Sequence, residues 1–205
     1  GEEEVEKRIP MFLLALRATS FIAGSVFAYY PFQLVVQPVE PQIKFLLGSN
    51  AGQKDLGNKE IQVNIGSDST SAGITVHPTY QTTYYKNLTL ISNTDSKAYN
   101  VYLILDQMSG SIPAGSKVWL IVYDYNATRD LPASYPQPGE PSGAVRVIEL
   151  TSTNTNNPQQ IGALSGNSMW EVDLMVYIPE GTSISGQQAT FNMHLVYTPS
   201  SEIPP

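Results

Sequence analysis

The chain has 205 residues, a net charge of −7 and 41% hydrophobic residues, a size and composition that suit one globular domain. Its 11 Lys and Arg residues are scattered, so it lacks the basic stripe that neutralises phosphates, and nucleic acid is excluded as an expected partner. It contains no cysteine, which excludes disulfide bonds and thiolate metal sites.

The N-terminal region combines a charged tip at 1–8 with an apolar segment at 9–30. One interpretation is a signal peptide, with Lys7 and Arg8 as the charged region and a small-residue cleavage site at 26–28. A second is a transmembrane helix, because roughly 22 residues can cross a bilayer. Against this helix, Arg17 near its centre would cost about 2.5–3.5 kcal/mol.

A third interpretation is that another subunit buries the segment as a β-strand. Apolar residues alternate in two registers, at 5–13 and at 21–29. Such a strand pairs with the open edge of a sheet in another molecule, which is β-augmentation. These registers predict the donor residues Ile9, Met11, Leu13, Phe21, Ala23 and Phe27. The predicted division of the chain is a donor or anchor segment at 1–36 and a β-sandwich domain at 37–205.

From residue 43 onward, short apolar runs separated by turn residues predict an all-β fold, an antiparallel β-sandwich. In one strand Val172 and Leu174 share a face, and in another Phe191 and Met193 do, as half-buried antiparallel strands require. The segment at 129–143 is predicted to be an exposed loop and 151–160 a polar insert. The nine predicted strands are 43–47, 61–65, 73–76, 84–92, 99–106, 117–123, 144–150, 170–178 and 189–197.

Catalysis has no candidate constellation in this sequence. The chain lacks a nucleophile elbow, a His-Glu-x-x-His motif, a phosphate-binding loop and a dinucleotide fingerprint. Its two histidines, His77 and His194, are isolated in sequence, and the alternation of the last strand places His194 on the surface. Oxygen-bearing side chains alternate at 124–130, but the stretch lacks the glycine and closing acid of a calcium loop, so it is interpreted as a turn. We therefore expect no enzymatic activity, no cofactor and no metal.

Two Asn-x-Thr sequons begin at Asn87 and Asn126 and predict N-glycosylation if the chain is exported. Within the strand at 84–92, Leu88 and Leu90 are expected to face inward and Asn87 outward. Chance sequons are common in a chain rich in Asn and Thr, so the alternative that neither carries a glycan stays open.

Several stretches resemble the TasA/camelysin family, and within it the archaeal bundling pili. They are IKFLLGSNAGQKDLGNKEIQVNI at 43–65, YYKNLTLISN at 84–93, AYNVYLIL at 98–105 and VDLMVYIPEGTSISGQQATFNMHLVY at 172–197. The resemblance implies a jelly-roll-like sandwich that polymerises outside the cell, each subunit lending an N-terminal strand to a groove in its neighbour. A sequon-bearing, Tyr- and Thr-rich surface would suit a glycosylated archaeal cell-surface protein.

Together these observations predict a structural subunit of an extracellular pilus or biofilm-matrix filament, a head-to-tail homopolymer whose filaments can bundle laterally. The predicted acceptor groove is lined by Val172, Leu174 and Phe191. The main alternative is a cell-surface binding module anchored in the membrane by its apolar segment. A secreted hydrolase with an unrecognised site is a third, disfavoured by the lack of a nucleophile with a paired acid and base.

Overall fold

The computed structural model describes residues 24–131, 141 and 143–205 of the chain. The chain divides into two units, Gly1–Val39 and Glu40–Pro205. In the first unit, the described residues 24–39 form neither helix nor strand. The predicted boundary between residues 36 and 37 stays a prediction.

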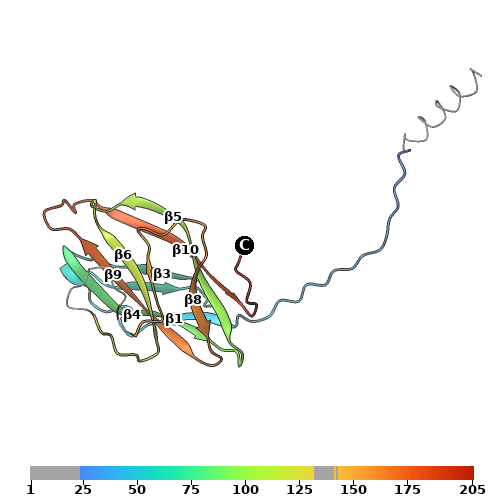
Figure 1. Ribbon diagram of the computed structural model, residues 1–205, viewed down its shortest axis with the longest axis horizontal. Coiled ribbons are helices and arrows are strands. Elements are labelled where there is room, and N and C mark those ends of the chain that lie inside the picture. Colours follow the sequence, from blue (N-terminus) through green and yellow to red (C-terminus); the bar gives the residue numbers. More distant parts are fainter. Residues whose placement is uncertain (1–23, 132–140, 142) are drawn as a thin grey trace, which may run out of the picture. The chain divides into compact units, whose positions relative to one another are not determined.

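The second unit is an antiparallel β-sandwich (Figure 1). One sheet has the strand order β1-β4-β9-β6-β7, a second has the order β10-β5-β8, and β2 pairs with β3 in a small hairpin. A single 3₁₀ turn, η1 (Leu56–Asn58), precedes β2. The strands are β1 (Ile43–Leu47), β2 (Gln62–Ile65), β3 (Ala72–Thr75), β4 (Gln81–Asn93), β5 (Tyr99–Ser111), β6 (Lys117–Asp124), β7 (Arg146–Glu149), β8 (Gln159–Leu164), β9 (Met169–Ile178) and β10 (Gln188–Thr198).

The predicted all-β sandwich is confirmed, and each of the nine predicted strands overlaps a strand of the structure. The sequence missed β8, whose first residues fall in the predicted polar insert. The two large apolar residues of β8, Ile161 and Leu164, are buried but three positions apart, because the pairing of β8 with β5 shifts register between Val101 and Tyr102. A bulge of this kind breaks the period-two alternation by which a strand is recognised.

The main hydrophobic core lies between the two larger sheets. It contains Val172 and Val176 from β9 together with Val101 and Leu103 from β5. Successive strand residues point to opposite faces, so in each of these strands every second side chain points into the space between the two sheets. The inward face predicted for β9 is therefore confirmed.

The outer face of the five-stranded sheet carries a second apolar cluster, which is also covered. Ile121, Tyr123 and Met175 are fully buried there, and Ala127 and Ala144 from the connection between β6 and β7 pack against them. The prediction that 129–143 is an exposed loop is wrong at its first residue, since only 9% of the Arg129 side chain is exposed. Local pattern could not predict this, because the two acids that Arg129 contacts, Glu171 and Asp173, lie on the distant strand β9.

A third cluster lies under the β2–β3 hairpin. Ile61, Tyr85 and Leu88 are buried in it, with Val63 from β2 packed alongside. Leu174 of β9 packs against this cluster and against the main core. The hairpin therefore extends the packing of the inner face of β9 beyond the three-stranded sheet.

Candidate assembly interface and buried polar network

The described N-terminal residues carry an unusual concentration of exposed apolar side chains. The least exposed of them, Val35, retains 63% of its surface and the most exposed, Phe32, retains 91%. Isolated exposed apolar residues are ordinary, but a contiguous run of them marks a surface that another molecule covers. The members are Val26, Phe27, Tyr29, Tyr30, Phe32, Leu34, Val35, Val36 and Val39.

The structure describes only one of the six predicted donor residues. Phe27 is 73% exposed, so its side chain is accessible to another molecule. The other five, Ile9, Met11, Leu13, Phe21 and Ala23, lie outside the described residues. The donor assignment stays a prediction.

Strand β10 forms an open edge of the three-stranded sheet, where it lies beside β5 (Figure 1). Within residues 24–131, 141 and 143–205, no strand pairs with its other side. Its inward side chains Met193 and Leu195 are only half-buried, whereas their β5 partners Leu105 and Leu103 are buried. Unpaired N–H and C=O groups beside apolar side chains form a template for an added strand.

The predicted acceptor residues differ in how much surface they keep. Phe191 of β10 and Leu174 of β9 are half-buried and contact the main core, so both retain surface for a partner. Val172 is only 4% exposed, so its own chain already covers it and it cannot line an open groove. The expectation for Val172 is therefore corrected, because the opposing strands close over it. Sequence alternation identified the face but could not show which of its residues stay uncovered.

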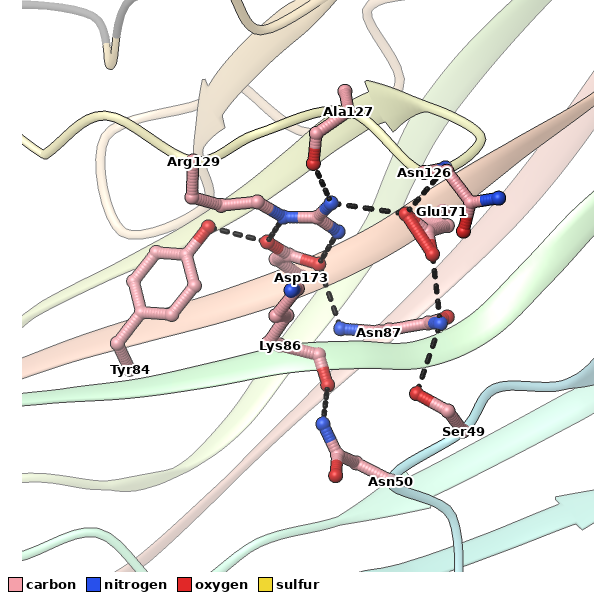
Figure 2. A network of polar contacts seen from close by, with 10 residues as sticks. All are labelled: Ser49, Asn50, Tyr84, Lys86, Asn87, Asn126, Ala127, Arg129, Glu171 and Asp173. Atoms are coloured by element: carbon pink, nitrogen blue, oxygen red, sulfur yellow. Dashed lines mark hydrogen bonds and ion pairs between the residues drawn. The ribbon is translucent and has the colours of Figure 1, made fainter.

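The opposite face of β9 carries a buried polar network that the sequence did not predict (Figure 2). Its acidic members are Glu171 and Asp173, with side chains 4% and 0% exposed. Arg129 reaches them from the turn after β6 and stacks over the ring of Tyr123, 4.4 Å from its centroid. Acids that alternate with apolar residues in a strand usually indicate a solvent-facing side, so the sequence pattern predicts exposure for Glu171 and Asp173, whereas both are buried.

Arg129 holds both carboxylates in a fork. Its Nη2 and Nε donate to Asp173, both at 2.8 Å, and its Nη1 donates to Glu171 at 2.9 Å. Nη1 also donates to the carbonyl of Ala127 at 2.7 Å, which fixes the turn that carries it. These contacts raise the pKa of Arg129 above its ordinary value, chiefly through the hydrogen bonds to Asp173. The guanidinium thus stays charged between two buried anions.

Asn87 completes the network from a bulge in β4. Its backbone φ is 48°, in the left-handed region that Asn tolerates. Its backbone N–H donates to Asp173 at 2.7 Å, and its amide donates to Glu171 at 2.8 Å and to Ser49 at 3.0 Å. The bulge also lies so close to Gly48 that a Cβ there would fall 2.1 Å from the Asn87 carbonyl oxygen. The Gly-Ser turn and the bulge therefore fit together.

The two sequons differ sharply in accessibility. The prediction that Asn87 faces outward is wrong: the residue is 7% exposed and its amide N–H groups are engaged, which argues against a glycan there. The bulge between Tyr85 and Thr89 reverses the expected facing by interrupting the alternation. Asn126 is exposed in the turn after β6, so it keeps the geometry of a glycan acceptor.

The network is closed to substrates. Burial is the main reason that the pKa of Tyr84 is raised above its ordinary value, and the hydrogen bond of its hydroxyl to Asp173 adds to it. The oxygens of both acids accept hydrogen bonds from groups of the chain itself. The network therefore joins β4, β9 and the turn after β6. Because both of its buried acids already accept hydrogen bonds, neither is free to act as an acid or base.

A second polar cluster supports the β2–β3 hairpin. Asp55 accepts hydrogen bonds from the Tyr85 hydroxyl at 2.8 Å, the Leu56 N–H at 2.7 Å and the His77 N–H at 2.7 Å. Burial raises the pKa of Asp55, but these hydrogen bonds outweigh it and leave the pKa below its ordinary value. Asp55 therefore remains an anion that holds the entry to β2 and the start of β4 together.

The histidines take no part in a shared site. His77 Nδ1 lies 3.1 Å from Asp55, while His194 pairs with Asp106 on the outer surface, where 74% of its side chain is exposed as predicted. Among the described residues, no three His, Asp or Glu side chains gather to hold a metal ion. The predicted turn at 124–130 is present, with the N–H of Ala127 donating to the carbonyl of Asp124.

The described residues form an all-β sandwich in which β10 is the longest outer strand, together with an exposed apolar segment. Comparison with protein-family models finds no match, and comparison with curated protein sequences finds none either. In the part of the chain that the structure describes, no helix is both long and apolar enough to span a bilayer.

Proposed function

We propose that this protein is the structural subunit of an extracellular, cell-surface filament, a pilus or biofilm-matrix fibre, that polymerises by donor-strand complementation. Each subunit inserts its N-terminal segment into the open side of the next identical subunit. Such a head-to-tail contact uses two different surfaces and does not close on itself, so an open fibre follows. The proposal assigns the protein no catalytic activity, cofactor or nucleic-acid partner.

One pairing of features carries the proposal. Residues 26–39 present large apolar side chains that are at least 63% exposed, while no strand among the described residues pairs with the outer edge of β10. Both are liabilities in a monomer, since each invites association. One contact between copies removes both at once.

The test is to express the full chain and a chain lacking residues 1–36, and to examine both by negative-stain microscopy. We expect fibres from the full chain, recoverable from sheared cells without detergent, and soluble subunits without fibres from the truncated chain. Circular dichroism checks that the truncated chain keeps its β structure. Normal fibres from that chain would overturn the proposal, and a full chain that stays in membranes until detergent releases it would favour the anchored binding module.

A further inference from the structure

Two adjacent registers within the exposed segment have different chemistry. The odd-numbered positions from 27 to 35 include Pro31 and Gln33 and are mixed in character. The even-numbered positions from 26 to 36 are all apolar, as in a strand with one buried face. They are Val26, Ala28, Tyr30, Phe32, Leu34 and Val36.

We propose that residues 26–36 are the inserting strand, that their even-numbered side chains enter the core, and that they pair with the open edge of β10 in a second copy of this chain. This inference rests on the proposed function and adds to it the donor register and the acceptor edge. The inserting strand therefore begins downstream of the donor residues Ile9, Met11 and Leu13 expected from the sequence. In this register the side chain of Phe27 points away from the core of the second copy.

The lengths of the two strands match. β10 contains 11 residues, and residues 26–36 provide the same length of extended chain. The other outer strands of the two larger sheets are shorter: β1 has 5 residues, β7 has 4 and β8 has 6. A donor paired with β10 therefore forms the longest ladder that any of these edges allows, and each ladder bond adds to the stability of the contact.

Proline placement supports the same register. In a strand, the N–H and C=O of alternate residues point to the same neighbour, so even-numbered residues address one side and odd-numbered residues the other. Pro31 has no N–H to donate, and it occupies the odd register. Every even-numbered residue from 26 to 36 retains its N–H, so a ladder formed through the even-numbered residues has an uninterrupted set of donors, whereas one formed through the odd-numbered residues would be broken at Pro31.

The acceptor has a matching apolar floor. Phe191, Met193 and Leu195 are half-buried along the inner side of β10. Leu174 is also half-buried, although its neighbours on the same face of β9, Val172 and Val176, are buried. It borders both the main core and the hairpin cluster. A strand beside β10 would cover Phe191, Met193 and Leu195 with its even-numbered face.

Neighbouring identical residues of opposite register make a matched test. In the full chain, Tyr30→Asp and Val36→Asp place a charge in the core, whereas Tyr29→Asp and Val35→Asp place it on the outer face. We expect filament mass, measured by sedimentation and microscopy, to fall at least tenfold for the first pair. For the second pair it should stay within about twofold of the unsubstituted chain.

Disulfide trapping identifies the acceptor, because the chain has no cysteine of its own. One chain carries Met193→Cys, and a second carries cysteine at position 28, 30, 32 or 34. After mixing and oxidation, we expect at least one even-numbered position to give a covalent dimer of the two chains on a non-reducing gel. Gln33→Cys, on the outer face, is the matched control and should give none.

The outcomes separate this inference from the proposed function. A full chain that forms no filament at all contradicts the proposed function. Filaments that survive the even-numbered substitutions, or fail equally with the odd-numbered ones, overturn the register alone. A chain carrying both cysteines that closes within one molecule, with no dimer from the mixture, shows that the acceptor belongs to the same copy and overturns the assignment to a second one.

Discussion

The two faces of strand β9 differ in which side chains they bury. On one face, Glu171 and Asp173 are charged yet almost fully buried, because Arg129 and Asn87 supply their hydrogen bonds. On the other, Leu174 is apolar yet only half-buried, where it borders the main core and the hairpin cluster. The contrast between Asp173 and Leu174 shows that a charged side chain can be buried when the chain supplies its partners, and that an apolar one can stay partly uncovered when the chain does not.

The contrast separates stability from assembly. The polar network is complete within one molecule, so disrupting it should damage the fold whether or not filaments form. The apolar edge is incomplete, so changes there should affect a single molecule little and the contact between molecules strongly. The first two of the following experiments test that difference, and the others test the hairpin cluster and the exposed sequon.

Removing the cation of the network should have the largest effect on stability. Arg129→Ala leaves two buried carboxylates without their counter-charge, and we expect the free energy of unfolding to fall by about 3–5 kcal/mol. Urea unfolding followed by tryptophan fluorescence measures the change. Lys117→Ala, at an exposed position on β6, is the control and should change it by less than about 0.5 kcal/mol. Similar small values for both variants would show that the network contributes nothing to the fold.

Two leucines that face each other across β5 and β10 make the second test. Leu103 is buried and Leu195 is half-buried, although they are register partners. Leu103→Ala should destabilise the dispersed subunit by about 2–5 kcal/mol, and Leu195→Ala by about 1 kcal/mol. Unfolding at protein concentrations too low for assembly provides both values. Equal losses would mean that β10 is as well covered as β5.

Acid should weaken the hairpin cluster through Asp55. Its pKa in the folded chain lies below the ordinary value of 3.8, so the unfolded chain binds the proton more readily. The stability that the ionised carboxylate contributes is therefore present above about pH 4 and is lost as the pH falls through the folded pKa. We expect Asp55→Asn to reduce the difference in urea midpoint between pH 6 and pH 3. Asp68→Asn, in the exposed turn between β2 and β3, should leave that difference unchanged.

Glycosylation should follow exposure and have the smallest effect on the fold. If the chain is exported through a glycosylating pathway, Thr128→Ala removes the sequon of Asn126 without touching its backbone, and intact-mass measurement should show the loss of one glycan. The unfolding midpoint of the unglycosylated chain should not change, because Thr128 is exposed. A glycan mapped to Asn87 by peptide analysis would contradict the buried position of that side chain.

Much of the fold could be predicted because strands are recognised by the local alternation of apolar and polar residues. The boundaries of β1 agree with the prediction, and the inward face of β9 does too. The prediction failed where a bulge interrupts the alternation, at Asn87 in β4 and in β8. It also missed the even-numbered alternation at 26–36, although that signal is present in the sequence.

The sequence by itself determined the all-β class and the apolar segment ahead of the sandwich, because each follows from the spacing of residues along the chain. Only the tertiary structure decided that Arg129 meets Asp173, that Val172 is covered, and that β10 lies at an edge. The physical reason is that burial and pairing depend on residues brought together from distant strands. No local pattern encodes which neighbour a strand will have, or which edge will be left without one.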